Sequence, residues 1–190
     1  MDSEDFVLNG GDGLSLPLLG SVSVMAAEGF EAWRSATFAP QWLEDAKAQA
    51  HSTDDGAVRR EVLFSVIAAE CYLYEWVRDE VVKHDYQALD KCFPRNGERS
   101  PSTLKKWRSV PQRFGIHLDP KLTQDGSDFD RLLKLRNGFA HGGVSRPERA
   151  SDEDVPAQSG WASTVVVDLI RSLHAAARTA PPSWLPPKGG

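Results

Sequence analysis

The longest uninterrupted helical pattern in the sequence runs from about Ala57 to His84, and it most limits what the chain can fold into. Apolar residues recur there at helical spacing, and no glycine or proline interrupts them. At a rise of about 1.5 Å per residue such a helix is roughly 40 Å long, which suits the central helix of a bundle. The apolar positions that share one face are Val62, Leu63, Val66, Leu73, Val77 and Val81.

Shorter helical patterns precede and follow this segment. Residues 1–20 are expected to be irregular because glycine and proline break their periodicity, and residues 21–56 are expected to form N-terminal helices over 22–36 and from Pro40 to about Gln49. Residues 57–178 form the expected helical core. No strand alternation or internal repeat stands out, so the sequence predicts an all-α, up-and-down bundle of about five to six helices.

Capping signals set the expected bounds within this core. A loop is predicted from Asp90 to Ser100, and Ser100-Pro101 is typical of the start of a helix that bends or stops near Pro111. Ser127 is expected to cap the next helix, with Asp130 resembling the second residue of a capping box, and Gly142-Gly143 to end it. A polar loop then leads to a last helix over about 161–178 and a flexible proline-rich tail, 179–190.

Composition favours one soluble domain. The chain has 190 residues, of which 41% are hydrophobic, enough for a core without disulfide or metal support. The two cysteines, Cys71 and Cys92, are expected to be reduced packing residues. The acidic N-terminus and the absence of a long apolar run predict a cytoplasmic protein with no membrane partner.

Charge is distributed unevenly along the chain. The net charge is -5, which by itself disfavours a nucleic-acid partner. Residues 1–57 hold ten acidic and two basic side chains, whereas residues 95–113 hold six basic side chains against Glu98 alone. Such a basic segment can bind phosphate, although a merely solvated surface is the simpler interpretation on charge alone.

Two charged residues fall within apolar helical stripes. Arg136 lies between Leu132, Leu133 and Ala140, and Glu70 lies in the middle of the stripe on the long helix. A lone charge in a core is too costly to keep, so each needs a partner or a solvent-lined cleft. We therefore expect the two helices to pack together, with Glu70 paired to Arg136.

Arg136, Asn137 and His141 form an Arg-Asn-x-x-x-His pattern. Asn137 and His141 are four residues apart and project from the same side of a helix. Histidine transfers protons near neutral pH, arginine holds phosphate oxygens as charge develops, and asparagine positions either group. These are the groups that RNA cleavage by its own 2′-hydroxyl requires. The alternative is that Arg136 is only an ion-pair partner and that His141 is favoured by the helix dipole.

The residues around this pattern resemble the signature of HEPN domains. The resemblance lies in 133–143 (LKLRNGFAHGG), in 67–76 (IAAECYLYEW), and in 102–107 (STLKKW) with Pro111 after it. It covers roughly residues 57–178. Gly138, a poor helix former, departs from the expected pattern and affects the geometry of the site.

The resemblance implies a homodimer in which the motif helices of both subunits line one cleft. It implies metal-independent endoribonuclease activity, often in toxin–antitoxin or phage-defence systems, with an antitoxin or another protein as a further partner. Carried onto this chain, Arg136, Asn137 and His141 take the catalytic positions. Glu70 joins the candidate catalytic residues on its place in the apolar stripe of the long helix, from which it is expected to orient Arg136. The alternatives are a non-catalytic HEPN module that binds a nucleotide, RNA or a protein, and a purely structural helical dimer.

Four basic residues are expected to hold the RNA backbone, namely Lys105, Lys106, Arg108 and Lys134. Trp107 between two of them is a candidate for base stacking, although a packing role is the simpler interpretation. The remaining histidines share no metal-ligand spacing, so neither a metal nor another cofactor is expected.

Overall fold

The computed structural model describes residues 36–54, 56–93, 101–141 and 151–186, with the side chain of His141 outside this description. The chain divides into two units, Met1–Ala36 and Thr37–Gly190, and every described helix belongs to the second. The irregular segment expected over 1–20 and the helix expected over 22–36 lie outside the described residues, apart from position 36.

All regular structure in the described ranges is helical, which confirms the expected all-α class for them. The α-helices are α2 (Ala39–Ala50), α3 (Ala57–Trp76), α4 (Tyr86–Cys92), α5 (Thr103–Gln112), α6 (Pro120–Thr123), α7 (Asp128–His141) and α8 (Trp161–Ala177). A π-helix, η2 (Val77–Val81), continues α3, and a short 3₁₀ helix, η3 (Asp152–Asp154), precedes α8. The boundaries of α2, α7 and α8, and of α3 taken together with η2, agree with those expected from periodicity and capping to within a few residues.

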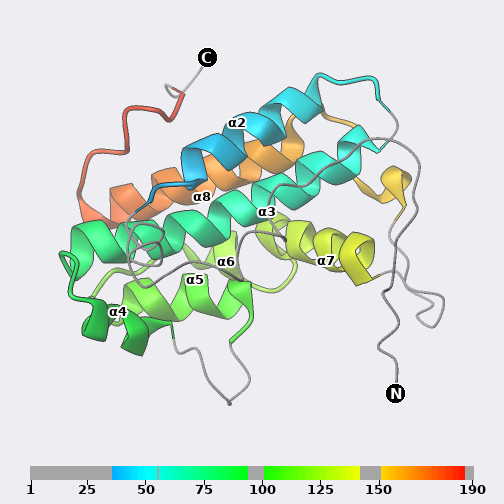
Figure 1. Ribbon diagram of the computed structural model, residues 1–190. Coiled ribbons are helices and arrows are strands. Elements are labelled where there is room, and N and C mark those ends of the chain that lie inside the picture. Colours follow the sequence, from blue (N-terminus) through cyan, green and yellow to red (C-terminus); the bar gives the residue numbers. More distant parts are fainter. Residues whose placement is uncertain (1–35, 55, 94–100, 142–150, 187–190) are drawn as a thin grey trace, which may run out of the picture. The chain divides into compact units, whose positions relative to one another are not determined.

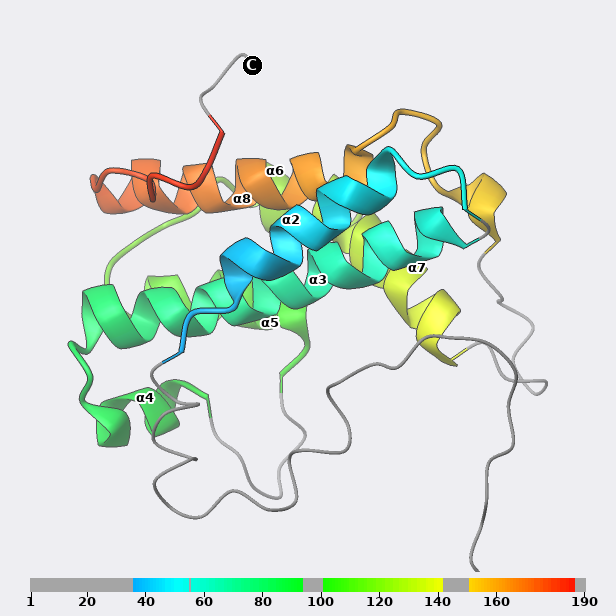
Figure 2. The ribbon, with the colours of Figure 1, turned by 45° about the horizontal axis from the view of Figure 1, so that its top comes forward.

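The central helix is α3, which packs against α2, α7 and α8. Figure 1 shows α2 along one side of α3 and α5 on the opposite side, and Figure 2 shows α2 crossing beside α3 and α8. The helical path ends at Val81 rather than at His84, because Lys83 and His84 adopt positive φ angles of 50° and 65° that no helix continues.

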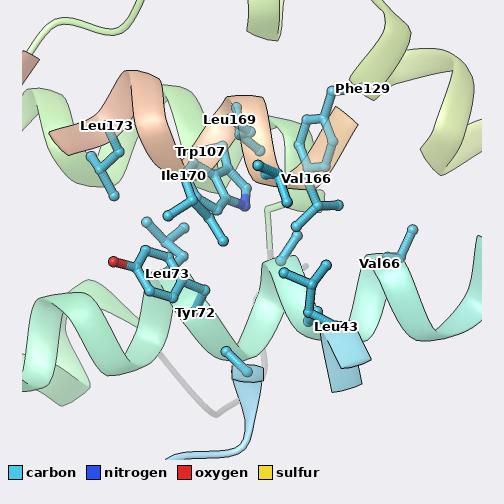
Figure 3. Close-up of a cluster of buried hydrophobic side chains, with 14 of the residues drawn as sticks. Leu43, Val66, Tyr72, Leu73, Trp107, Phe129, Val166, Leu169, Ile170 and Leu173 are labelled. Atoms are coloured by element: carbon cyan, nitrogen blue, oxygen red, sulfur yellow. The ribbon is translucent and has the colours of Figure 1, made fainter. Parts of the chain in front are cut away.

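The core forms where α3 and α8 face each other. Val66 and Leu73 of α3 and Val166, Ile170 and Leu173 of α8 are buried together, as Figure 3 shows. Trp107 of α5 is fully buried in the same cluster, with its ring edge-on to that of Phe129 at 77°. Each such side chain contributes about 1.5–3 kcal/mol by leaving water, so the core holds α5 and α7 against the central helix.

Two buried glutamates on α3 join it to the beginnings of two other helices. Glu61 Oε1 accepts hydrogen bonds from the backbone N–H groups of Ala162 and Ser163 in the first turn of α8, at 3.1 and 3.3 Å. Glu75 Oε1 accepts from those of Phe38 and Ala39 at the start of α2. These carboxylates satisfy N–H groups that have no partner within their own helices. Burial raises the pKa of both, while the donated N–H groups oppose that shift.

The segment between α3 and α5 differs from the expectation. A loop was expected from Asp90, but α4 extends to Cys92, and Asp85 caps it by accepting from the N–H groups of Gln87 and Ala88. Helix α5 begins at Thr103 with Ser102 as its cap, so Ser102 takes the role expected of Ser100, which lies outside the described residues. The expected stop near Pro111 is confirmed, since α5 ends at Gln112.

The proline-rich tail is packed in the part that the structure describes. Leu185 is buried, and the Trp184 ring meets the Tyr72 ring edge-on at a centroid distance of 5.7 Å. Arg171 donates a hydrogen bond to the Pro186 carbonyl. The described part of the segment expected to be a flexible tail, residues 179–186, thus contacts the helical core through two apolar side chains near its end.

Candidate active site

The predicted pair between Glu70 and Arg136 is present in the structure. The Arg136 Nη2 atom donates to Glu70 Oε1 at 3.1 Å and joins α7 to α3. The side chains are 27% and 38% exposed, so the pair lies at the edge of the helix interface rather than within the core. Solvent can therefore reach the pair, as a site for a substrate requires.

Thr103 completes this contact from a third helix. Its hydroxyl donates to the same Glu70 oxygen at 2.5 Å, so one carboxylate oxygen joins α3, α5 and α7. Sequence reasoning missed Thr103, because nothing in its position at the start of α5 indicates which residue of α3 it meets. The start of α5, which carries Lys105 and Lys106, is therefore connected through Glu70 to α7, which carries Arg136 and Asn137.

The motif residues follow one another along the last two turns of α7. Arg136 Nη1 donates to the Asn137 side-chain oxygen at 3.1 Å, and Asn137 is exposed. His141 is the last residue of α7, so the four-residue spacing between Asn137 and His141 is helical in the backbone. The position of the His141 imidazole lies outside the described residues. The catalytic roles of these residues and of Glu70 remain predictions.

The start of α7 follows its capping signal in part. Ser127 accepts a hydrogen bond from the Asp130 N–H at 3.1 Å, as expected. The Asp130 carboxylate accepts from the Gly126 N–H at 2.8 Å instead of from Ser127, so the capping box is incomplete. The expected glycine stop at 142–143 lies outside the described residues.

Helix α7 continues across Gly138 up to His141. Phe139 packs at the edge of the core, and the Arg59 guanidinium lies 5.8 Å from the centre of its ring. Arg59 Nε also donates to Asp152 at 2.6 Å in η3. These contacts bind the last turn of α7 to neighbouring elements and compensate for the weak helix propensity of glycine.

The four expected phosphate-binding residues fall into two groups. Arg108 is paired with Asp125 at 3.0 Å and also donates to the Thr123 carbonyl, and Lys134 is paired with Asp130 at 2.7 Å. Within the described ranges, no acidic side chain lies within ion-pair distance of the exposed Lys105 or the half-exposed Lys106. Of the four, Lys105 and Lys106 are therefore the two without an acidic partner in the part of the chain that the structure describes.

The surroundings of Trp107 and of the two cysteines decide what these residues can do. Trp107 is fully buried, so its packing role is confirmed and base stacking is not open to it. Both cysteines are free, and burial raises the pKa of Cys71 to about 12, which keeps it a thiol at neutral pH.

Among residues 36–54, 56–93, 101–141 and 151–186 there is no cluster of metal-ligating side chains. The same residues contain no helix of the length and apolarity that crossing a bilayer requires.

Comparison with known proteins finds no relative of the chain. No protein-family model, no curated protein and no solved structure matches the chain. The chemistry of the site is therefore argued from its own residues.

Proposed function

We propose that the protein is a metal-independent endoribonuclease of the HEPN type. The observation that carries this proposal is the solvent-reachable Glu70–Arg136 pair, which places the Arg-Asn-x-x-x-His motif beside the start of a helix with two uncompensated lysines. An ion pair with a purely structural role could be fully buried, whereas a pair that binds a substrate has to be reachable from solvent. The pair here leaves other N–H groups of Arg136 for a substrate.

In the proposed reaction the RNA 2′-oxygen attacks the adjacent phosphorus. The O2′–P bond forms, the P–O5′ bond breaks, the 2′-hydroxyl proton leaves to a base, and the 5′-oxygen receives a proton. The products are a 2′,3′-cyclic phosphate and a 5′-hydroxyl. His141 acts as the general acid or base, and Arg136 stabilises the charge that develops on the phosphorane oxygens.

The remaining residues position these two groups. Glu70 fixes one Nη atom of Arg136, and Asn137 fixes the other, so the guanidinium loses little freedom when phosphate binds. Lys105 and Lys106 hold the RNA backbone beside the cleaved bond. A homodimer with both motif helices in one cleft belongs to this proposal, as does a partner protein that controls cleavage.

The decisive experiment is RNA cleavage in EDTA by the wild type, Arg136→Ala and His141→Ala. We expect wild-type cleavage with 2′,3′-cyclic phosphate ends and a loss of at least about 100-fold in each variant. General acid–base catalysis, lost with His141, typically contributes 10²–10⁴-fold, and a donor that stabilises developing charge, lost with Arg136, about 10²–10³-fold. His51→Ala is the matched control, because His51 is exposed just after α2 and takes no part in the site. Equal cleavage by His141→Ala and the wild type would contradict the assigned role.

A non-catalytic module that binds RNA, a nucleotide or a protein is the second candidate. It is favoured by the pairing of Arg108 and Lys134 with acidic residues, which leaves less basic surface than the sequence indicates. Failure of the wild type to cleave any of several RNAs, together with binding to one of them, would select this candidate.

A further inference from the structure

A hollow of about 550 Å³ lies beside the second half of α5 and α6, away from Thr103 at the start of α5. It is open to solvent and lined by the second half of α5, the segment after it, and α6 with the turn that follows. Its volume falls within the range of small-molecule sites. Its polar lining residues are Arg108, Gln112, His117, Thr123, Gln124 and Asp125.

The guanidinium of Arg108 is held in place at this hollow. Its Nε donates to the Thr123 carbonyl and its Nη2 donates to Asp125 at 3.0 Å. Two bonds from different nitrogens restrict the guanidinium plane, and the Asp125 carboxylate offsets its charge. A guanidinium with a carboxylate partner is a weaker phosphate ligand than a free one, and its flat face remains a surface on which an unstacked base can lie.

The other lining groups also suit a flat, uncharged ligand. Gln112 and Gln124 are exposed amides, each with hydrogen-bond donors and an acceptor, and they match the mixed edges of nucleobases. Leu118 and Pro120 add apolar surface, and His117 adds a second planar ring. A site for a phosphate would instead concentrate uncompensated cations.

We propose that this hollow is a base-binding subsite for single-stranded RNA. Along α5, Thr103 meets Glu70, Lys105 and Lys106 follow, and Arg108 and Gln112 reach the hollow. Gln112 lies nine residues beyond Thr103, roughly 14 Å along the axis. Lys105, Arg108 and Gln112 share one face of α5, so a strand whose backbone contacts the lysines can place a base in the hollow. The choice of RNA as ligand rests on the proposed function.

The test is binding of the full-length wild type to uncleavable 2′-O-methyl RNA pentamers that carry 2-aminopurine at each position in turn. We expect the fluorescence to change most at one position, and an abasic residue there to weaken binding roughly 10-fold. Gln124→Ala should weaken the intact pentamer several-fold and the abasic pentamer not at all. Gln41→Ala removes an equivalent exposed amide on α2 and should bind both pentamers as the wild type does.

The outcomes separate this inference from the nuclease proposal. Equal affinities and fluorescence for Gln124→Ala and the wild type would overturn the subsite, as would equal binding of abasic and intact pentamers. Position-specific binding that is lost in Gln124→Ala supports the subsite even where the wild type cleaves no RNA, a result that would reject only the nuclease. Because Gln124 is exposed, circular dichroism should show an unchanged fold in this variant.

Discussion

One oxygen of Glu70 determines how the residues of the candidate site are arranged. It accepts hydrogen bonds from Arg136 on α7 and from Thr103 on α5, two residues that are 33 positions apart in the sequence. The carboxylate is more than a third exposed, so water competes with both donors and the contacts contribute modestly to stability. Their main effect is to restrict Arg136 to one orientation at the entrance of the site.

Replacing Thr103 tests this arrangement. We expect Thr103→Val, which keeps the side-chain shape, to lower the free energy of unfolding by about 1 kcal/mol, because it leaves one Glu70 contact unmade. Thr103→Ser keeps the hydroxyl and should retain most of that stability. Urea denaturation of the two variants makes the comparison, and equal midpoints would show that this hydrogen bond contributes nothing.

At the scale of elements, α3 organises its neighbours with carboxylates as well as with apolar side chains. Glu61 caps α8 and Glu75 caps α2, and both are buried. The residues that begin these two helices supply no side-chain cap of their own. Remote capping therefore fixes where α8 and α2 begin relative to the central helix.

Glu61→Ala should destabilise the protein by about 1–3 kcal/mol, because it leaves the buried N–H groups of Ala162 and Ser163 without an acceptor. Glu61→Gln keeps an acceptor oxygen and should cost less. Glu44→Ala, on the exposed side of α2, is the control and should change stability little. Urea denaturation measures all three, and a Glu61→Ala protein as stable as Glu44→Ala would refute the capping role.

At the scale of the whole unit, a buried histidine connects the tail to the central helix. The two ring nitrogens of His174 contact the Tyr72 hydroxyl of α3 and, at 2.7 Å, the Thr179 hydroxyl just after α8. Trp184 then packs on the same Tyr72. Burial lowers the pKa of His174 below its ordinary value of 6.5, and the Glu80 carboxylate in η2 opposes this shift.

Stability should therefore depend on pH through His174. The pKa of His174 is lower in the folded protein than in the unfolded chain, so the unfolded chain binds more protons as the pH falls. The contribution of His174 to stability is therefore full above pH 6.5 and is lost as the pH falls through the folded pKa. Denaturation at several pH values between about 5 and 7.5 should show a steeper decline for the wild type than for His174→Gln. Parallel curves for the two proteins would exclude His174 as the source.

Local sequence determined the longer helices and one long-range contact, whereas the short helices α4 and α6 were not expected from it. Uninterrupted periodicity placed α3, capping and proline placed α2 and α7, and two charges within apolar stripes predicted the Glu70–Arg136 pair. These features are visible in the sequence because helix periodicity is local and because a charge on an apolar face demands a partner. The motif at Arg136, Asn137 and His141 is likewise a local pattern.

Only the tertiary structure decided which side chains meet across the bundle. The third member of the site, Thr103, the capping roles of Glu61 and Glu75, and the neutralisation of Arg108 by Asp125 all join residues that are distant in sequence or on different elements. The docking of Trp184 and Leu185 is of the same kind. Such contacts depend on how the helices rotate and slide against one another. Packing of the whole core sets that geometry, whereas a single segment does not encode it.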